Sequence, residues 1–257
     1  MEIIGYAPVP PTMSELCRAT GLHKSTVYRF LQVLEDLGYI APDAEGRYGL
    51  AYKFLDLAMT VDGPMALRRS AHGVLLALSE RLGESVQLAI LEGTKVVYCD
   101  KVDAIRSLRI ETRFGQRLNA HATGLGKVML AYLPEDEVSR LYSGYNFERH
   151  TANTIQSLDR LSEALRNIRS SGHGLDDEEY VAGLKCIAAP VFGTRGNVIA
   201  ALSVSGPAIR MTDQTMPEMI ARVKDAAATI TGRLSTAPGR FASAATARAG
   251  PDPGVTS

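Results

Sequence analysis

The order of helix and turn signals in residues 12–50 limits the fold of this chain more than any other feature. Thr12 is followed three residues later by Glu15, which is the spacing of a capping box at the start of a helix. This helix is expected to end near Gly21, because glycine readily adopts the left-handed conformation that terminates helices. The pattern therefore predicts a short first helix followed by a tight turn.

A second helix is predicted over residues 24–37, with Gly38 at its C-terminal end. Apolar residues recur in it at steps of three and four and are expected to form one buried stripe: Val27, Phe30, Leu31, Leu34 and Leu37. The other side carries hydrogen-bonding side chains: Lys24, Ser25, Thr26, Tyr28, Arg29 and Gln32. Two short strands joined by a polar turn are predicted next, over residues 39–50, with Arg47 near the turn.

This series of helix, turn, helix and hairpin is typical of a winged helix-turn-helix, whose second helix enters the major groove of DNA. The N-terminal half of that helix needs donors for base edges and backbone amides near the phosphates. Arg29 is the strongest candidate for a base or phosphate contact, and Arg47 is expected beside the DNA backbone. The alternative interpretation is a small helical packing unit with a solvated polar face, and the complete series argues against it.

The net charge of residues 1–60 predicts how this region binds DNA. Residues 1–60 carry five basic and seven acidic side chains, so their formal net charge is −2, while the whole chain is neutral. Nonspecific attraction to phosphate should therefore be modest, and DNA binding should depend on a local patch and on the avidity of a dimer.

The length of 257 residues and the 46% of hydrophobic residues suit a protein of two parts with a sizeable core. We find no apolar run long enough to span a bilayer and no basic start of a secretory signal, so a cytoplasmic location without membrane contact is expected. The three cysteines, Cys17, Cys99 and Cys186, have no C-x-x-C spacing, so no disulfide framework, zinc site or other cofactor is predicted.

Past residue 50 the pattern changes to helices interrupted at Gly63-Pro64, and then to a mixture of strands and helices. Strands are expected over residues 85–92, 95–102, 107–112, 185–192 and 197–205. Helices are expected over residues 123–133, after Pro134, and over residues 157–170 and 213–234. Strands in hairpins with helices inserted between them predict an α+β sensor domain. The last stretch, 237–257, is poor in large apolar residues and is expected to be disordered.

Small polar side chains mark a candidate ligand pocket. Ser203 and Ser205 share one face of a strand, and a tight hairpin would place Cys186 opposite Ser203. The segment 121–127 opens a helix with two glycines, and free backbone amides at such an end attract a carboxylate or phosphate. Asp176 and its neighbour Asp177 fall in a Gly-rich segment, residues 172–179, where either could accept a hydrogen bond from a ligand hydroxyl. Together these features predict a pocket for a small organic acid.

Each feature also has a purely structural interpretation. Serines on a strand commonly bond to the backbone, a cysteine is commonly a small buried hydrophobe, and glycines at a helix start commonly permit close packing. The acidic run 176–179, taken alone, is typical of a solvated loop.

Over residues 10–236 the chain resembles the IclR family of bacterial transcriptional regulators. The resemblance rests on three separated motifs: residues 22–29 with 34–39, residues 118–127, and residues 186–192 with 201–207. It implies a winged helix-turn-helix (residues 1–60), a linker helix region (61–75) and a GAF-like effector-binding domain with an antiparallel sheet (76–236). It also implies a homodimer or dimer of dimers that binds a double-stranded DNA operator and a small organic acid.

The resemblance further implies effector contacts by position. The amides of Gly124 and Leu125 match the carboxylate cradle of the family, and Leu108 and Ile110 match its apolar lid. Side-chain contacts are matched by Asp176, Cys186, Ser203 and Ser205. One departure is the segment before the helix-turn-helix: only residues 1–6 precede a Pro-rich stretch, so the first helix is expected to be truncated and the domain to be less stable, or the start to lie upstream.

Two other functions compete with ligand-controlled DNA binding. The second domain could be a redox or thiol enzyme with Cys186 as nucleophile and His121 as base, although no resolving cysteine lies nearby. Alternatively, the sensor could bind a protein partner instead of DNA. We expect the allosteric regulator, in which an acid in the second domain alters, through the linker around Asp62, the spacing of two recognition helices.

Overall fold

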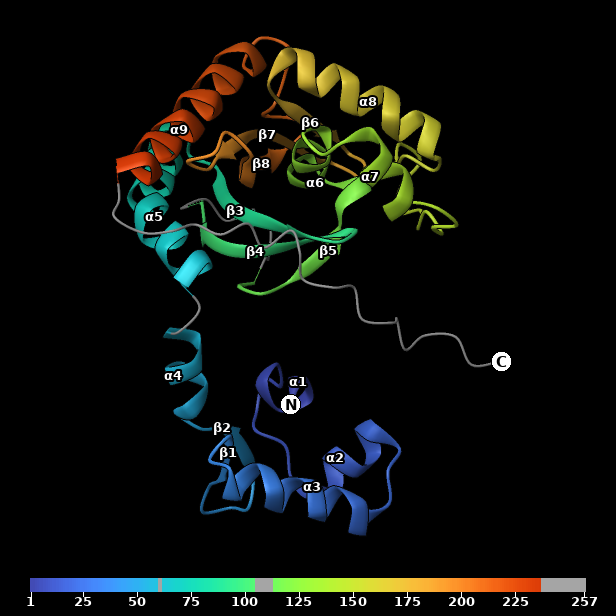
Figure 1. The fold of residues 1–257 in the computed structure, drawn as a ribbon, viewed down its shortest axis with the longest axis vertical. Coiled ribbons are helices and arrows are strands. Elements are labelled where there is room, and N and C mark those ends of the chain that lie inside the picture. The colour runs from blue at the N-terminus through green and yellow to red at the C-terminus, as the bar shows by residue number, and fades with distance from the viewer. Residues whose placement is uncertain (60–61, 105–112, 237–257) are drawn as a thin grey trace. The chain divides into compact units, whose positions relative to one another are not determined.

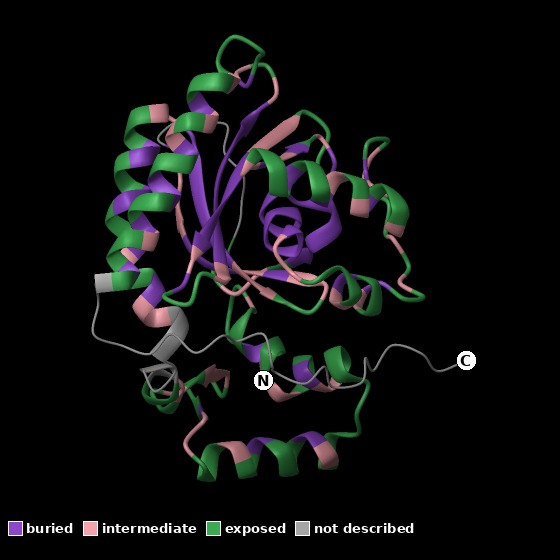
Figure 2. Ribbon diagram, turned by 45° about the horizontal axis from the view of Figure 1, so that its top comes forward, coloured by how far each residue is buried: buried purple, intermediate pink, exposed green. Residues whose placement is uncertain are grey.

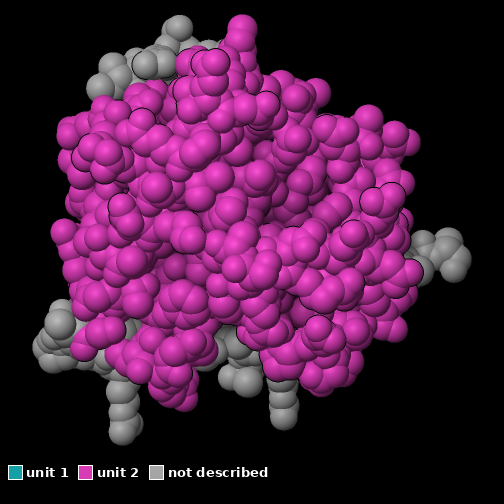
Figure 3. Space-filling view, turned by 90° about the horizontal axis from the view of Figure 1, so that it is seen from above, with its two compact units in different colours: residues 1–62 teal, residues 63–257 magenta. Residues whose placement is uncertain are grey.

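The computed structural model describes residues 1–59, 62–104 and 113–236, and it divides into two compact units, Met1–Asp62 and Gly63–Ser257 (Figure 1). The larger unit is magenta in Figure 3. The predicted strand over 107–112, which includes Leu108 and Ile110, lies outside the described residues, and so does the predicted disordered tail 237–257.

The first unit has the predicted order of elements. Its helices are α1 (Glu2–Gly5), α2 (Met13–Thr20), α3 (Lys24–Asp36) and α4 (Lys53–Met59), and its strands are β1 (Ile40–Pro42) and β2 (Tyr48–Leu50). The two strands pair antiparallel, and Thr12 bridges to Arg47 beside them. The capping box between Thr12 and Glu15 is present, and Gly21 and Gly38 both have the left-handed conformation, with φ of +66° and +75°. This unit is therefore a small winged helix-turn-helix.

The core of the first unit is narrower than the predicted stripe. It consists of five buried side chains: Ile4, Leu16, Val27, Leu31 and Ile40. Leu34 packs against them, but Phe30 and Leu37 are 59% and 49% exposed, so their assignment to the core was wrong. At about 100° per residue, these two side chains lie roughly 60° to 80° around the helix from Val27, beyond the part of α3 that faces its neighbours. A small unit covers only a narrow face of its longest helix.

The second unit is a six-stranded antiparallel sheet covered by helices on both faces. Its strands are β3 (Ser85–Glu92), β4 (Lys95–Val102), β5 (Arg117–Asn119), β6 (Gly174–Asp177), β7 (Leu184–Phe192) and β8 (Val198–Pro207), in the spatial order β5-β4-β3-β8-β7-β6. Its helices are α5 (Asp62–Leu82), α6 (Gly124–Ala131), α7 (Glu135–Leu141), α8 (Leu158–Ser171) and α9 (Met216–Thr236), and a 3-10 turn, Ala120–Ala122, precedes α6. Figure 1 shows α5 and α9 on one face of the sheet and α6 and α8 on the other.

The alternation of strand residues explains these two layers. Leu202 and Val204 of β8 face the core beneath α5 and α9, while Ala201 faces the core beneath α6 and α8. The same alternation puts Ser203 and Ser205 on the α6 side, as predicted. The fold is thus the expected α+β arrangement.

Two helices are present here as predicted, but the interruption was expected at Gly63-Pro64, whereas α5 already includes both residues. It runs without a break from Asp62 to Leu82, and Gly63 and Pro64 lie in its first turn, where proline is tolerated. Its buried residues, among them Leu67 and Leu75, pack against the sheet. The helix that was expected to link two domains therefore belongs to the core of the second unit.

Three details of the sheet also differ from prediction. The register of β7 and β8 pairs Cys186 with Ser205, not with Ser203, because the connecting loop spans residues 193–197 and a β-bulge follows Val191. Strand β5 was not predicted. Finally, the segment read as a Gly-rich loop over 172–179 contains strand β6.

Candidate functional site

The N-terminal part of α3 presents the polar face that a recognition helix needs. Lys24, Ser25, Tyr28, Arg29 and Gln32 are exposed, and Thr26 is partly exposed. Gln32 Nε2 donates to Tyr28 Oη at 2.9 Å, which fixes these two side chains side by side. His23 at the N-cap makes no side-chain capping bond, so the first amides of α3 face outward without a side-chain partner. Figure 2 shows how little of this helix is buried.

Arg47 lies at the base of the wing. Its guanidinium Nη1 donates to the carbonyl of Pro10 at 3.2 Å and lies 3.8 Å from the Glu15 carboxylate. Asp43 Oδ1 accepts the Arg47 backbone N–H at 2.8 Å, which shapes the turn of the wing. These bonds give Arg47 a structural role in joining the wing to α2, and its contact with DNA stays a prediction.

A cavity of about 130 Å³ lies between the start of α6 and the sheet of the second unit. Six of the eight predicted effector residues line it: Gly124, Leu125, Asp176, Cys186, Ser203 and Ser205. The other two, Leu108 and Ile110, lie outside the described residues. Further lining residues are Tyr98, Gln116, Leu118, Thr123, Tyr180, Val181 and Leu184.

The sheet register explains why the polar side chains meet. Asp176 of β6 pairs with Cys186 of β7, which pairs with Ser205 of β8, so these three residues form one row across the sheet. Ser203 lies in the next row opposite Ala188. Because pairing residues point to the same face, the row presents a carboxyl, a thiol and a hydroxyl to the same space.

Small residues let α6 approach this row closely. A Cβ on Gly126 would collide with the backbone of Ala120, and one on Gly174 would meet Val128 Cγ2 at 2.7 Å. A Cβ on Gly124 would lie 3.5 Å from that of Ala188. The glycines therefore serve close packing, and this packing brings the first amides of α6 above the polar row.

Asp176 is buried together with a charged pair. Its Oδ1 accepts the backbone N–H of Glu179 at 2.7 Å, and burial raises the pKa of its carboxyl to about 7. Behind it, the ammonium of Lys127 on α6 pairs with Glu179. The acidic run is thus not a solvated loop: Asp176 and Glu179 are buried, and only Asp177, paired with Lys185 at 2.8 Å, lies largely in solvent.

Cys186 is not an activated nucleophile. Burial raises the pKa of its thiol, and Sγ lies 3.0 Å from Ser205 Oγ. His121, the proposed base, is fully buried elsewhere, with Nε2 3.3 Å from the carbonyl of Glu148 and with Phe147 at its edge. A thiolate and a base within reach are both required, so the thiol-enzyme hypothesis is not supported.

Sequence reasoning missed several residues of this site. Gln87 on β3 is 2% exposed, and its Oε1 accepts the hydroxyls of Ser203 and Ser205 at 3.1 and 3.0 Å. Its signal was present in β3, where Ser85 and Gln87 alternate with apolar residues. Tyr98 of β4 and Tyr180 of the β6–β7 connection also line the cavity. Their aromatic rings alone do not reveal a site, since such residues are common in cores.

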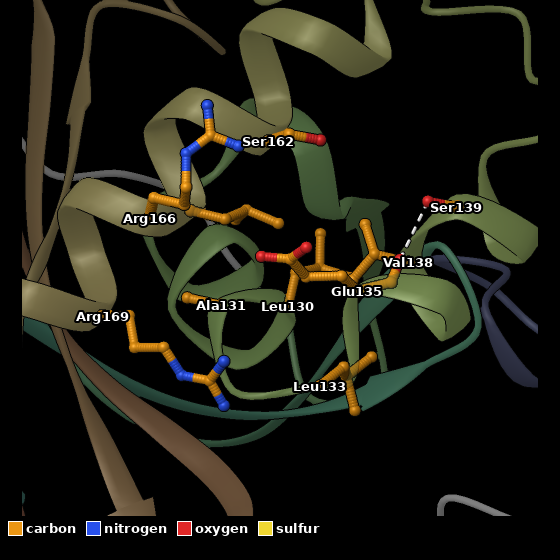
Figure 4. Close-up of a pocket in the computed structure, with 10 residues that line it drawn as sticks. Leu130, Ala131, Leu133, Glu135, Val138, Ser139, Ser162, Arg166 and Arg169 are labelled. Atoms are coloured by element: carbon orange, nitrogen blue, oxygen red, sulfur yellow. Dashed lines mark hydrogen bonds between the residues drawn. The ribbon is translucent and has the colours of Figure 1, made fainter.

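A second cavity, of about 110 Å³, lies among α6, α7 and α8, and no predicted site residue lines it. Figure 4 shows Arg166 and Arg169 extending from α8 on either side of Glu135. In the described ranges, no group of three or more His, Cys, Asp or Glu side chains could hold a metal ion. None of the helices described here is long and apolar enough to cross a membrane.

A winged helix-turn-helix with an exposed polar second helix, joined to a unit whose cavity is lined by both polar and apolar residues, defines a DNA-binding protein with a sensor domain. Comparison of sequences gives the family. The protein-family model for "Bacterial transcriptional regulator IclR C-terminal" matches residues 60–232, and the family model for the "IclR helix-turn-helix domain" matches residues 1–44. The chain belongs to the IclR family of bacterial transcriptional regulators.

Related proteins and solved structures support the assignment to this family. The HTH-type transcriptional regulator KdgR of Escherichia coli is 37% identical over 223 residues, which cover 86% of this chain and 85% of that protein. The crystal structure of Thermotoga maritima IclR has a TM-score of 0.75 at 29% identity and covers 91% of this chain and 95% of its own. An IclR homolog from Microbacterium hydrocarbonoxydans, solved with 4-hydroxybenzoate, has a TM-score of 0.81, with coverage of 92% and 96%, and shares the fold at 24% identity. The chain is a DNA-binding transcriptional regulator with a C-terminal effector domain, and not an enzyme.

Proposed function

We propose that a small carboxylic acid binds in the 130 Å³ cavity of the second unit and controls the affinity of the first unit for an operator in double-stranded DNA. The observation that carries this proposal is the convergence of helix-start amides and a row of polar side chains on one cavity. The protein would act as a homodimer or dimer of dimers in the cytoplasm.

The carboxylate would lie at the start of α6. The side chain of Thr123 accepts the N–H of Gly126 at 3.1 Å, which leaves the N–H groups of Gly124 and Leu125 for a ligand. The positive end of the helix dipole favours an anion at this point. An apolar cavity of about 150 Å³ holds a benzene molecule, so this cavity suits a compact acid of similar size.

On the DNA side, the exposed residues of α3 would enter the major groove. Arg29 is the proposed base or phosphate contact, with Lys24 and Ser25 near the start of the helix and Tyr28 and Gln32 beside them. Thr26, partly exposed, and Arg47 of the wing complete the proposed face. Two such helices in a dimer would read two half-sites, so that a change in their spacing changes the affinity.

The proposed control of DNA binding would pass from the cavity toward the first unit through β3 and α5. Strand β3 contacts the serine pair through Gln87 on one face and packs Val86 and Leu88 beneath α5 on the other. Helix α5 begins at Asp62, where the first unit ends. A ligand that moves β3 would therefore shift α5 and, through it, bias the arrangement of two DNA-binding units.

A paired measurement tests the proposal. Calorimetric titration of the full chain with a panel of small carboxylates identifies binders, and gel retardation of its own promoter fragment, with and without each binder, measures operator affinity. We expect at least one acid to bind and to change operator affinity by about fivefold or more. The double substitution Ser203→Ala with Ser205→Ala should abolish both effects of the acid. An acid that saturates the cavity without changing operator affinity would contradict the proposal.

A further inference from the structure

The second cavity, of about 110 Å³ among α6, α7 and α8, combines an apolar floor with a charged rim. Its floor consists of side chains that are buried or partly buried: Leu130, Ala131, Leu133, Val138 and Leu165. Its rim carries the exposed side chains of Glu135, Arg166 and Arg169, together with the partly exposed Ser162. Apolar surface below a charged rim suits a ligand with a hydrocarbon body and a charged head.

The two arginines of the rim are available to bind an anion. They lie three positions apart on α8, so they project from the same side of the helix. Arg169 Cζ lies 5.9 Å from the centroid of the Tyr132 ring, and that ring packs edge-on against Phe192. Stacking on this ring holds the guanidinium in place but leaves the N–H groups at its edge unused. Because no described carboxylate forms an ion pair with either arginine, both can donate to a ligand carboxylate.

Glu135, at the start of α7, adds a negative charge between the two arginines (Figure 4). Its main-chain carbonyl accepts the Ser139 hydroxyl at 2.8 Å, whereas its carboxylate has no ion-pair partner among the described residues. A simple anion at this rim would be attracted by the arginines but repelled by Glu135, and a simple cation would meet the opposite balance. A ligand that carries both charges satisfies all three groups.

We propose that this cavity is a second ligand site, which binds a free α-amino acid with a short aliphatic side chain. The carboxylate would pair with Arg166 and Arg169, the ammonium with Glu135, and the side chain would lie on the apolar floor. A cavity of about 150 Å³ holds benzene, so one of about 110 Å³ suits a branched side chain of roughly three or four carbons. The inference does not depend on the proposed function, because none of these residues lines the cavity at the start of α6.

The test titrates the full chain by calorimetry with L-valine and with two molecules that each lack one of its charged groups. Isovalerate lacks the ammonium, and isobutylamine lacks the carboxylate. L-Valine should bind about fivefold or more tightly than either of them. Replacing both arginines, Arg166→Gln with Arg169→Gln, should weaken the binding of L-valine by about tenfold and remove its advantage over isobutylamine. Glu135→Gln should remove its advantage over isovalerate.

Matched substitutions separate this site from general effects of charge. Arg160→Gln and Glu163→Gln make the same changes of charge at exposed positions of α8 that do not line the cavity, and each should leave the Kd for L-valine within about twofold. The double variant Ser203→Ala with Ser205→Ala alters the cavity at the start of α6 and should also leave this Kd unchanged. The rim variants change exposed side chains only, so circular dichroism should show the unsubstituted fold.

Three results would overturn the inference. The first is that neither L-valine nor L-leucine binds to the unsubstituted chain. The second is that isovalerate or isobutylamine binds as tightly as L-valine, which would mean that only one of the two charges is recognised. The third is that L-valine binding survives the double arginine substitution, or is lost with the serine pair, which would place the amino acid in the other cavity. The proposed function is tested by its own panel of acids, so its failure is a separate result.

Discussion

Each unit holds an ion pair close to its candidate site, and the surroundings of the two pairs differ. In the DNA-binding unit, Arg47 and Glu15 lie 3.8 Å apart with side chains 37% and 45% exposed. In the effector unit, the side chains of Lys127 and Glu179 are only 4% and 10% exposed. Water screens the first pair, so it adds little stability, whereas neither member of the second can lose its partner without leaving a buried charge.

The N-terminal ends of α3 and α6 also differ in their exposure to solvent. Helix α3 begins without a side-chain cap and is largely exposed, while α6 is capped by Thr123 and all of its residues are buried. Both starts are suited to an anion, but the proposed anions differ: a DNA phosphate would reach α3 from solvent, and a small acid would bind beside the buried start of α6. Under the proposed function, the first unit therefore exposes the groups that it uses, and the second buries them. The following predictions test this contrast.

Breaking the buried ion pair should have the largest effect. Lys127→Met leaves Glu179 charged and buried, with its Oε2 already without a hydrogen-bond partner, and should lower the free energy of unfolding by about 3–5 kcal/mol. Arg47→Ala should cost about 1 kcal/mol or less. Scanning calorimetry of the full chain measures both. The double variant Lys127→Met with Glu179→Leu should recover most of the loss, and equal losses in Lys127→Met and Arg47→Ala would refute the contrast.

Close packing at α6 predicts the next largest effect. Gly126→Ala places a methyl group against the Ala120 backbone and should destabilise the effector unit by about 3 kcal/mol, with loss of acid binding. Gly232→Ala is the matched control, because a Cβ at this position of α9 meets nothing within 4 Å. It should raise the stability by about 0.5–1 kcal/mol, since alanine favours helices. A tolerated Gly126→Ala would show that α6 need not lie so close to the sheet.

The pH dependence of stability reports on Asp176. Its pKa is about 7 in the folded protein, above the ordinary value, because burial disfavours the charged form. Between about pH 4 and 7 the folded chain therefore holds a proton that the unfolded chain has lost, and stability falls as the pH rises through this range. Asp176→Asn removes this dependence. Relative to the unsubstituted protein, its free energy of unfolding should rise by about 2 kcal/mol between pH 5.5 and 7, and stay level above that. A difference that is constant from pH 5.5 to 8.5 would contradict this account of Asp176.

Removing a helix cap should have the smallest effect on stability, and the effect should be similar in both units. Thr12 caps α2 and is partly exposed, and Ser157 caps α8 and is exposed. Thr12→Ala and Ser157→Ala should each cost about 1 kcal/mol in stability. Urea unfolding followed by circular dichroism measures both variants. A loss several times larger for Thr12→Ala would show that the small core of the first unit depends on its cap in a way that the second does not.

The regular elements could be predicted because their patterns are local. Strands β3 and β4 have the predicted bounds, and the capping box and glycines of the first unit fix its helices. Strand β5 is only three residues long, so its alternation of polar and apolar side chains is too short to distinguish it from a loop. Strand β6 begins at Gly174 and ends in two acidic residues, and only its pairing with β7 makes it a strand.

The residues of the site were predicted from the sequence, but the register in which β7 pairs with β8 was not. The period of two put Ser203 and Ser205 on one face, and the predicted register was wrong by two residues, so Cys186 still fell on the same face as the serines. The mistake came from a bulge and a longer loop, which leave no clear trace in a single sequence. Gln87 was missed because a polar residue on a strand ordinarily faces solvent, whereas here it lies opposite Ser203 on the face of the sheet that α6 covers.

The central claim is that the exposed face of α3 and the buried cavity perform separate tasks. One experiment measures operator affinity by gel retardation and acid affinity by calorimetry in Arg29→Ala and in the double variant Ser203→Ala with Ser205→Ala. We predict that Arg29→Ala loses at least tenfold in operator binding while its Kd for the acid stays within twofold, and that the double variant does the reverse. Equal losses of both activities in either variant would contradict the claim.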